Sequence, residues 1–271
     1  MTVPFIMTAI FWASDLHCGH APVGSLQAFV DAMHGAPDPA VVLTGDIAVA
    51  SRLVADLEFL GDAARRPLYF VLGNHDHYGS TVEKVRDAVI ELSRRRPDIQ
   101  WLPPAGVVAL DETTVLVGVD GWADGRQGDP LHTPLRLNDD RFIGELAAQP
   151  NRAARLAVKQ ALADADAARL ATLLERAVAM ARQLVVATHV PPFPEALPAT
   201  GRLSSAEWFP LLVCGATGIV LRTAAAAHPG HRFLVLCGHT HVERDVMILP
   251  NLQCRVAGAR YGEPAGRSIA V

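Results

Sequence analysis

Five short apolar runs, each ending abruptly in a cluster of polar residues, constrain the fold of this chain more than any other feature. Continuous apolar runs of this length, rich in β-branched residues, are typical of strands that are buried on both faces. The runs occupy residues 9–13, 41–44, 68–72, 184–188 and 233–237. The polar clusters begin at Ser14, Gly45, Gly73, His189 and Gly238. We therefore expect five buried strands whose carboxyl ends carry polar loops.

Helical patterns separate the early runs. Apolar residues recur at helical spacing through 26–33, and Gly35 follows as a C-terminal stop. Ser80 and Glu83 form a capping-box signature ahead of a second apolar stripe, with Pro97 beyond the expected helix end. Strands that alternate with helices predict βαβ units, and hence a largely parallel sheet with helices on its faces. In such sheets ligands collect at the carboxyl ends of strands, which is where all five polar clusters fall.

The segment from about 120 to 182 departs from this alternation. It follows an expected antiparallel hairpin of 107–110 and 114–119, whose connection is too short for a parallel crossover. Residues 121–140 are rich in glycine, proline and charge, whereas 141–182 show helical periodicity. We interpret 120–182 as an elaboration over or beside the core.

Length and composition favour a single domain. Half of the 271 residues are hydrophobic, which is enough to bury one large core or two modest ones. We expect one domain spanning 1–271, with the loop and helical elaboration at about 120–182. Further strands are expected in the tail, at 246–249, 252–257 and 267–271.

Charge and cysteine content limit the classes of partner and compartment. A formal net charge of −4 argues against a broad cationic surface, and so against a nucleic-acid or anionic-membrane partner. No stretch approaches the roughly 18 uninterrupted apolar residues of a membrane helix. Residues 1–13 are apolar but lack the positive charge of a signal peptide. The four cysteines form no CxxC pair, so a reducing, cytoplasmic setting is expected.

Seven polar residues at the ends of the apolar runs are candidate metal ligands. Successive side chains alternate faces in a strand, so Asp15 and His17 are expected to point the same way, as are His239 and His241. The other three candidates stand just beyond their own runs: Asp46, Asn74 and His189. Oxygen and imidazole ligands without thiolate suit Mn, Fe or Zn better than a structural cysteine-type zinc site. Seven ligands are too many for one ion, whereas a pair of ions with a shared carboxylate accommodates them.

Simpler interpretations exist for each residue taken alone. A lone His17, His189 or His241 is more often a structural histidine than a ligand, and Asp46 alone is compatible with a helix cap. These alternatives are disfavoured because all seven residues follow buried runs in order. Trp122 and Arg126 are candidates for substrate contacts, by ring stacking and by phosphate binding. A packing tryptophan and a surface arginine are the alternatives.

Two histidines close to the candidate ligands also admit two interpretations. His20 and His77 are near enough in sequence to line the site. The alternative is that both are solvated loop histidines, since connecting segments run over the protein surface.

The ordered series D-x-H, G-D, G-N-H-D, H and G-H-x-H resembles the calcineurin-like metallophosphoesterase superfamily. The resemblance covers the strand ends from about 9 to 242 but not the content of 120–182. It implies an α/β (α+β) fold, a β-sandwich flanked by helices with a dinuclear metal centre at the carboxyl ends of the strands. The ions implied are divalent Mn, Fe or Zn, with Mn or an Fe/Mn pair favoured.

The resemblance also implies a role for each residue. The first metal is assigned to Asp15, His17, Asp46 and His241. The second is assigned to Asp46, Asn74, His189 and His239, with Asp46 bridging both ions. His75 matches the residue that contacts the phosphate and helps the leaving group to depart, and Asp76 matches the residue that orients it. A metal-bridging hydroxide is the implied nucleophile.

The function implied by the resemblance is phosphoester hydrolysis. We expect a small phosphorylated substrate, either a phosphodiester similar to a cyclic nucleotide or a phosphomonoester. We also expect the loop after residue 120 to control substrate choice without forming part of the metal site. A protein serine/threonine phosphatase is the alternative enzyme, and the acidic balance disfavours a nuclease. A non-catalytic interaction scaffold is disfavoured because it has no chemical need for all seven ligands.

Overall fold

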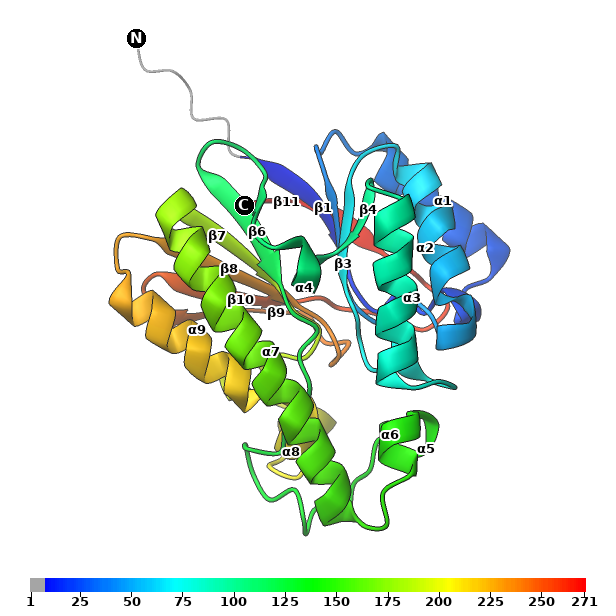
Figure 1. Cartoon of the computed structure of the whole chain (residues 1–271), viewed down its shortest axis with the longest axis vertical. Coiled ribbons are helices and arrows are strands. Elements are labelled where there is room, and N and C mark those ends of the chain that lie inside the picture. The colour runs from blue at the N-terminus through cyan, green and yellow to red at the C-terminus, as the bar shows by residue number, and fades with distance from the viewer. Residues whose placement is uncertain (1–7) are drawn as a thin grey trace.

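Two mixed β-sheets packed face to face lie at the centre of the computed structural model, which describes residues 8–271 (Figure 1). The strands of the first sheet are β1 (Ala9–Ala13), β2 (Val41–Thr44), β3 (Leu68–Val71), β4 (Ile99–Trp101) and β11 (Gly266–Ala270). Their order is β11-β1-β2-β3-β4, and β11 is antiparallel to β1 while the other neighbours are parallel. The expected parallel core is therefore closed at one edge by the C-terminal strand.

The second sheet continues the parallel pattern and has an antiparallel strand at each edge. Its strands are β5 (Val108–Ala109), β6 (Thr114–Gly118), β7 (Gln183–Ala187), β8 (Arg232–Cys237), β9 (Arg244–Leu249) and β10 (Leu252–Val256). Their order is β5-β6-β7-β8-β10-β9. The predicted hairpin is β5 and β6, and the predicted tail strands are β9, β10 and β11. The sheets together confirm the mixed α/β fold expected from the resemblance.

Helices cover the outer face of each sheet (Figure 1). The first sheet is covered by α1 (Val23–Gly35), α2 (Ala50–Ala64) and α3 (Val82–Arg95). The second is covered by α7 (Arg152–Met180) and α9 (Gly215–Ala227). Short helices are α4 (Leu102–Ala105), α5 (Asp139–Phe142), α6 (Gly144–Ala147) and α8 (Phe209–Leu212). Single turns of 3-10 helix are η1 (Cys18–His20), η2 (His75–His77), η3 (Pro194–Ala196) and η4 (Arg202–Ser204).

The strands are buried on both faces because each sheet lies between a helical layer and the other sheet. In β1, Phe11 packs among residues of the helical layer, whereas its neighbours Ile10 and Trp12 pack between the two sheets. Burial of one such side chain stabilises the fold by about 1.5–3 kcal/mol. This arrangement explains why the runs are continuously apolar and do not alternate with polar residues. It also makes the strand ends rigid supports for the loops that follow.

A buried ionic network holds the carboxyl end of β6 beside the first sheet. The Asp120 carboxylate accepts hydrogen bonds from Leu72 N, Trp101 Nε1 and Arg86, at 2.9, 2.9 and 3.0 Å. Asp166 of α7 also faces Arg86, at 3.4 Å. Two buried carboxylates thus share one guanidinium, and burial followed by the charge of Asp120 raises the pKa of Asp166 to about 7. The network ties α3 and α7 to the strand ends.

The N-terminal end of α3, a helix that covers the first sheet, is capped by a local side chain and by the 120–182 segment. Thr81 caps α3 by accepting from Lys84 N at 3.2 Å, so the expected capping box of Ser80 and Glu83 is wrong by one residue. A carboxylate from α6 also serves this helix end, because Glu145 accepts from Val82 N at 2.9 Å. The backbone N–H of Val82, one of the donors left without a partner at a helix start, is thus satisfied by a residue far away in the sequence and not by a local capping box.

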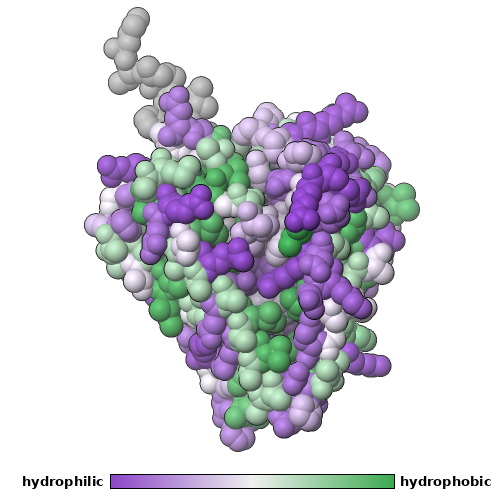
Figure 2. Space-filling model, in the orientation of Figure 1, coloured by the Kyte–Doolittle hydropathy of each residue, from purple (hydrophilic) through white to green (hydrophobic). Residues whose placement is uncertain are grey.

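The hydropathy of the surface and of the helices shows no extended apolar region on the face drawn in Figure 2 or along any described helix. On the face drawn in Figure 2, hydrophilic side chains gather over α3, and apolar atoms lie in small scattered groups. None of the helices in residues 8–271 combines the length and the apolar character needed to cross a membrane.

Candidate metal centre

Loops from both sheets are joined to one another at the carboxyl ends of the strands. In the first sheet, Asp15 N donates to Gly45 O at 3.0 Å. In the second sheet, Gly238 N donates to His189 O at 2.9 Å. The two sheets are then linked, because the backbone N of His239 donates to Asp15 Oδ1 at 3.0 Å. The loops after β1, β2, β7 and β8 therefore form one hydrogen-bonded unit.

Left-handed backbone turns bring the candidate ligands together. Within residues 8–271, six non-glycine residues have positive φ, and five of these are candidate ligands. They are Asp15 (53°), His17 (43°), Asp46 (51°), His239 (69°) and His241 (58°). Such conformations cost roughly 1–3 kcal/mol each and cluster at functional sites. The expectation that alternation along a strand aligns the two D-x-H and H-x-H pairs is wrong, since β1 and β8 end before these residues and the turns align them instead.

Three candidate ligands form a compact group on one side of the centre. His17 Nε2 lies 3.2 Å from His241 Nε2, and His241 Nε2 lies 3.3 Å from Asp15 Oδ1. One ligand atom from each of the three side chains falls within 4.8 Å of the others. Two imidazoles and a carboxylate at this spacing are able to share one cation.

Asp46 lies between this group and a second one. Its Oδ2 is 3.8 Å from His17 Nε2, and its Oδ1 is 3.4 Å from His189 Nε2. On the far side, His189 Nε2 lies 3.1 Å from Asn74 Oδ1. The two oxygens of one carboxylate thus face two different sets of ligands, as a bridging ligand requires.

Hydrogen bonds that histidine rings donate to backbone carbonyls determine which ring nitrogens are available to a cation. His189 Nδ1 lies 2.9 Å from Thr44 O, and His239 Nε2 lies 3.1 Å from Leu211 O. A carbonyl only accepts, so each of these nitrogens carries a proton, and the other nitrogen of each ring is the one that can bind a cation. Metal-binding histidines are held in this way. The free nitrogen of His189 is Nε2, which faces Asn74, and that of His239 is Nδ1.

The charges of the centre favour a cation. Burial opposes ionisation of Asp46 and Asp15, yet the nearby histidines lower the pKa of both carboxyls, that of Asp46 well below its usual range. Burial also opposes a charge on His189, but Asp46 outweighs it and raises the pKa of His189 to about 10. Burial dominates at His17 and lowers its pKa to about 4. Asp46 thus favours a proton on His189 Nε2 when no cation is bound, and a cation held at this nitrogen would take the place of that proton. The mixed oxygen and nitrogen donors fit divalent Mn, Fe or Zn.

His75 lies at the edge of the centre with its ring partly exposed. Its side chain is 20% exposed, and Nε2 is 3.9 Å from Asp46 Oδ2. The backbone N of His75 donates to Asp46 Oδ1 at 2.8 Å, and its ring stacks on Tyr78 with centroids 4.2 Å apart. The imidazole is therefore held in place while one side remains open to a substrate.

Asp76 makes contacts that differ from the role implied by the resemblance. Its carboxylate is fully buried and accepts from Ile47 N, Ala48 N and Gly73 N at 2.9, 2.9 and 2.8 Å. Among the described residues it makes no hydrogen bond to His75. Burial, followed by the charge on the nearby Asp46 carboxylate, raises the pKa of Asp76 to about 8. In the structure Asp76 holds the loops after β2 and β3 together and does not orient the His75 ring through a direct bond.

The proposed substrate contacts in the 121–140 loop lie elsewhere. Trp122 is 3% exposed and packs against the buried ring of His77, so the packing alternative is confirmed for this tryptophan. His77 itself is fully buried and neither lines the site nor faces solvent. Arg126 pairs with Asp124 and Asp164, at 2.8 Å in both cases. Neither Trp122 nor Arg126 is presented to the centre.

Tyr261 is an aromatic residue at the centre that the sequence patterns did not indicate. The residue is 53% exposed, and its ring stacks on His17 with centroids 4.4 Å apart and lies 5.2 Å from the ring of His241. The exposed His20 ring is 5.2 Å away. Tyr261 belongs to the connection between β10 and β11, which follows no apolar run of the predicted parallel core. Its place depends on the antiparallel return of β11 alongside β1.

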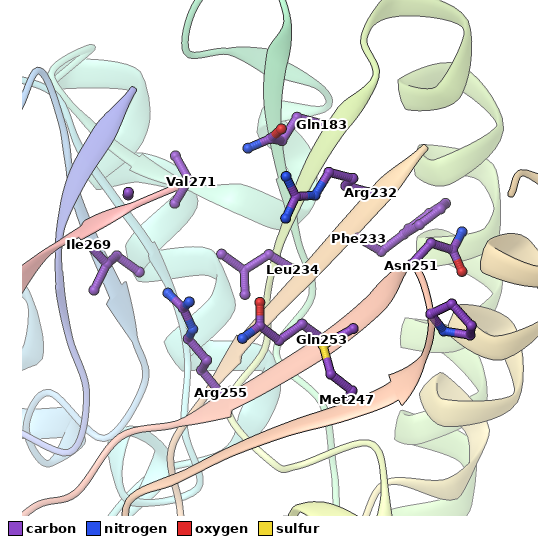
Figure 3. A pocket seen from close by; sticks show the side chains of 12 residues that line it. Gln183, Arg232, Phe233, Leu234, Met247, Asn251, Gln253, Arg255, Ile269 and Val271 are labelled. Carbon is purple, nitrogen blue, oxygen red and sulfur yellow. The ribbon is translucent and has the colours of Figure 1, made fainter. Parts of the chain in front are cut away.

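A cavity at the opposite end of the strands carries a different chemistry. It has a volume of about 300 Å³ and is lined by Leu234, Ile269 and the two arginines Arg232 and Arg255 (Figure 3). None of the candidate ligands lines it. Arg255 is paired with Asp245 at 3.1 Å. The cavity therefore does not mark the candidate centre.

Comparison with known proteins identifies the family and the fold of the chain. The model of the calcineurin-like phosphoesterase family matches residues 8–243. The chain is similar to a phosphopantetheinyl hydrolase from Mycobacterium tuberculosis, with a TM-score of 0.67 and 17% identity over 94% of this chain and 90% of that one. It is also similar to a dimetal phosphatase from Danio rerio, with a TM-score of 0.61 and 11% identity over 93% and 88%. No curated protein sequence matches the chain significantly. At identities of 17% and 11%, the likeness to these two solved structures shows a shared fold.

Substitution at Gly238 tests whether the close approach of the loops is needed for metal binding. A Cβ at Gly238 would overlap Ser14 Oγ and Asp15 Oδ2, which are both buried. Gly238→Ala is therefore expected to displace Asp15 and to weaken binding of Mn²⁺ by about 10–100-fold, the usual effect of disturbing a ligand's support. Titration of metal-free protein by calorimetry measures the change. Gly24→Ala, which meets no atom within 4 Å, is the matched control, and equal affinity of the two variants would contradict the expectation.

Proposed function

The chain belongs to the calcineurin-like phosphoesterase family and is a phosphoesterase, and we propose that it hydrolyses a small phosphodiester or phosphomonoester at a pair of divalent metal ions. The proposed ligands are Asp15, His17, Asp46, Asn74, His189, His239 and His241. The observation that carries the proposal is the position of Asp46. Its two oxygens face the two groups of ligands, which is the arrangement that a shared carboxylate needs.

Each ion is assigned to one side of Asp46. Asp15, His17 and His241 are the proposed partners of Asp46 at the first ion, since their donor atoms lie together. Asn74, His189 and His239 are proposed at the second ion. The backbone hydrogen bonds of His189 and His239 support this assignment, because each occupies one ring nitrogen and leaves the other available to a cation.

The chemistry divides between the ions and the side chains of this chain. When bound, the two ions supply positive charge that neutralises the phosphoryl group and activates water as the nucleophile. His75 is proposed to hydrogen-bond the phosphate and to donate a proton to the leaving oxygen. Its partial exposure and its fixed ring support this role, because a general acid must lie within reach of the leaving group.

Tyr261 is proposed to form a wall of the substrate site. Its ring stacks on His17, and the residue is half exposed, so a base, a phenyl group or an alkyl chain of a substrate is able to pack against it. The substrate panel that tests the function contains a cyclic nucleotide, a phosphomonoester, a phosphoserine peptide and a phosphopantetheinyl ester. The last is included because of the phosphopantetheinyl hydrolase of similar fold.

Removal of the bridging carboxylate is expected to abolish hydrolysis. Asp46→Ala takes a ligand from both proposed ions, so turnover of bis-p-nitrophenyl phosphate with Mn²⁺ should fall to background. Asp31→Ala, which removes an exposed carboxylate from α1, is the control for charge and should keep full activity. Substantial turnover by the Asp46 variant, or by chelated parent protein, would exclude the two-metal proposal.

Removal of the His75 imidazole is expected to slow the chemistry without loss of metal. His75→Ala should lower kcat by about 10²–10⁴-fold for an alkyl phosphoester, the usual range for a lost general acid. The loss should be smaller for a nitrophenyl ester, because nitrophenolate departs without protonation. Metal content by mass spectrometry should match that of the parent. A fall in metal content, or an equal loss with both leaving groups, would show that His75 has another role.

Substitution at Tyr261 is expected to affect substrate binding alone. A stacked aromatic contact contributes roughly 0.5–1.5 kcal/mol beyond its buried area, so Tyr261→Ala should raise KM by about 2–10-fold. Tyr261→Phe retains the ring and is expected to keep the parent KM. Steady-state kinetics on the preferred substrate of the panel measure both. The proposal fails if the alanine variant has the same KM as the parent for every substrate that the parent hydrolyses.

A further inference from the structure

Asp139 brings a buried carboxylate from the 120–182 segment to the edge of the metal centre. It lies at the start of α5 and is 4% exposed. Its Oδ1 accepts a hydrogen bond from Asn74 Nδ2 at 2.8 Å and another from Tyr78 OH at 2.7 Å. Asn74 Nδ2 is also 3.2 Å from Tyr78 OH. One oxygen of Asp139 therefore contacts both a proposed ligand and the residue beneath His75.

These contacts determine which way the Asn74 amide points. An amide has a donor end and an acceptor end, and an ionised carboxylate only accepts. Asp139 thus selects the donor end of Asn74. The acceptor end, Oδ1, is turned toward His189 Nε2 at 3.1 Å, on the side of the proposed second ion. We propose that Asp139 is a positioning residue that presents Asn74 Oδ1 to this ion, an inference that rests on the proposed function.

The Asp139 carboxylate also fixes the position of His75, the proposed general acid, through Tyr78. Tyr78 donates its hydroxyl to Asp139 and stacks its ring on His75 with centroids 4.2 Å apart. Asp139 thereby acts on His75 through Tyr78. A metal ligand and the proposed proton donor are consecutive in sequence, and both are supported from one buried oxygen.

Backbone contacts hold α5 and α6 against the loop that carries Asn74. Gly79 N donates to Phe142 O at 2.9 Å, and Gly144 N donates to Ser80 O at 2.8 Å. Glu145 completes the attachment by accepting from Val82 N at 2.9 Å. The expectation that the loop after residue 120 does not form part of the metal site stays a prediction, because Asp139 contacts a proposed ligand and is not itself one. The helical part of the segment lies against the Asn74 loop, while the loop before it packs away from the centre.

The test is a metal titration of the metal-free protein and two variants. Asp139→Ala is expected to weaken binding of the second Mn²⁺ by about 10–100-fold and to leave the first unchanged, because only Asn74 loses its support. Asp139→Asn keeps an oxygen acceptor of the same shape and should recover part of the affinity. Calorimetry measures both affinities. Electron paramagnetic resonance at intermediate Mn²⁺ should show a single uncoupled ion in the alanine variant, where the parent shows a coupled pair.

Asp140→Ala is the matched control. Asp140 is the neighbouring carboxylate of the same helical turn, and it pairs with Lys159 at 3.0 Å and not with the centre. Unchanged affinity for the second ion in Asp139→Ala would overturn the inference. Equal weakening of both ions, with a drop in the melting temperature of the metal-free protein, would also overturn it by showing a merely structural role. Parent protein that binds fewer than two ions would refute the proposed function itself, and the inference with it.

Discussion

Left-handed turns directly after buried strands are the constraint on which the metal centre depends. Five proposed ligands have positive φ, at a cost of roughly 1–3 kcal/mol each. The cost is offset by the two-sheet core, which fixes the strand ends, and by hydrogen bonds between loops, such as that from His239 N to Asp15. Because the strand ends cannot shift, the strained turns persist and their side chains converge. The buried sandwich and the reactive centre are thus parts of one structure.

Sequence patterns predicted the strands and the proposed ligands but not the means of their convergence. Apolar runs indicate buried strands directly, and ligand types that follow them in order are visible in the sequence. Backbone φ values are not visible there, so alternation along a strand was the wrong explanation for Asp15 and His17. Tyr261 and Asp139 were missed for another reason: each reaches the centre through tertiary packing, Tyr261 by the return of β11 and Asp139 by the docking of α5. No local motif records either contact.

Two buried carboxyl groups outside the proposed ligand set, Asp76 and Asp120, hold different loops of the site in place. Asp76 binds three backbone N–H groups after β2 and β3, whereas Asp120 joins β6 to α3 through Arg86. Asp120 also accepts from His189 N through its carbonyl at 2.7 Å, so the ionic network reaches a proposed ligand. Buried polar groups that are fully hydrogen-bonded favour one arrangement over others. The 120–182 segment belongs to this support through Asp166 and Asp139, and these contacts are the basis for the proposal that it positions a metal ligand.

The central claim is that two divalent ions share the Asp46 carboxylate, and anomalous diffraction from crystals of Mn²⁺-loaded protein tests it most directly. The account predicts two peaks, one among Asp15, His17 and His241 and the other beside Asn74, His189 and His239, with Asp46 between them. A single peak, or peaks away from Asp46, would contradict it.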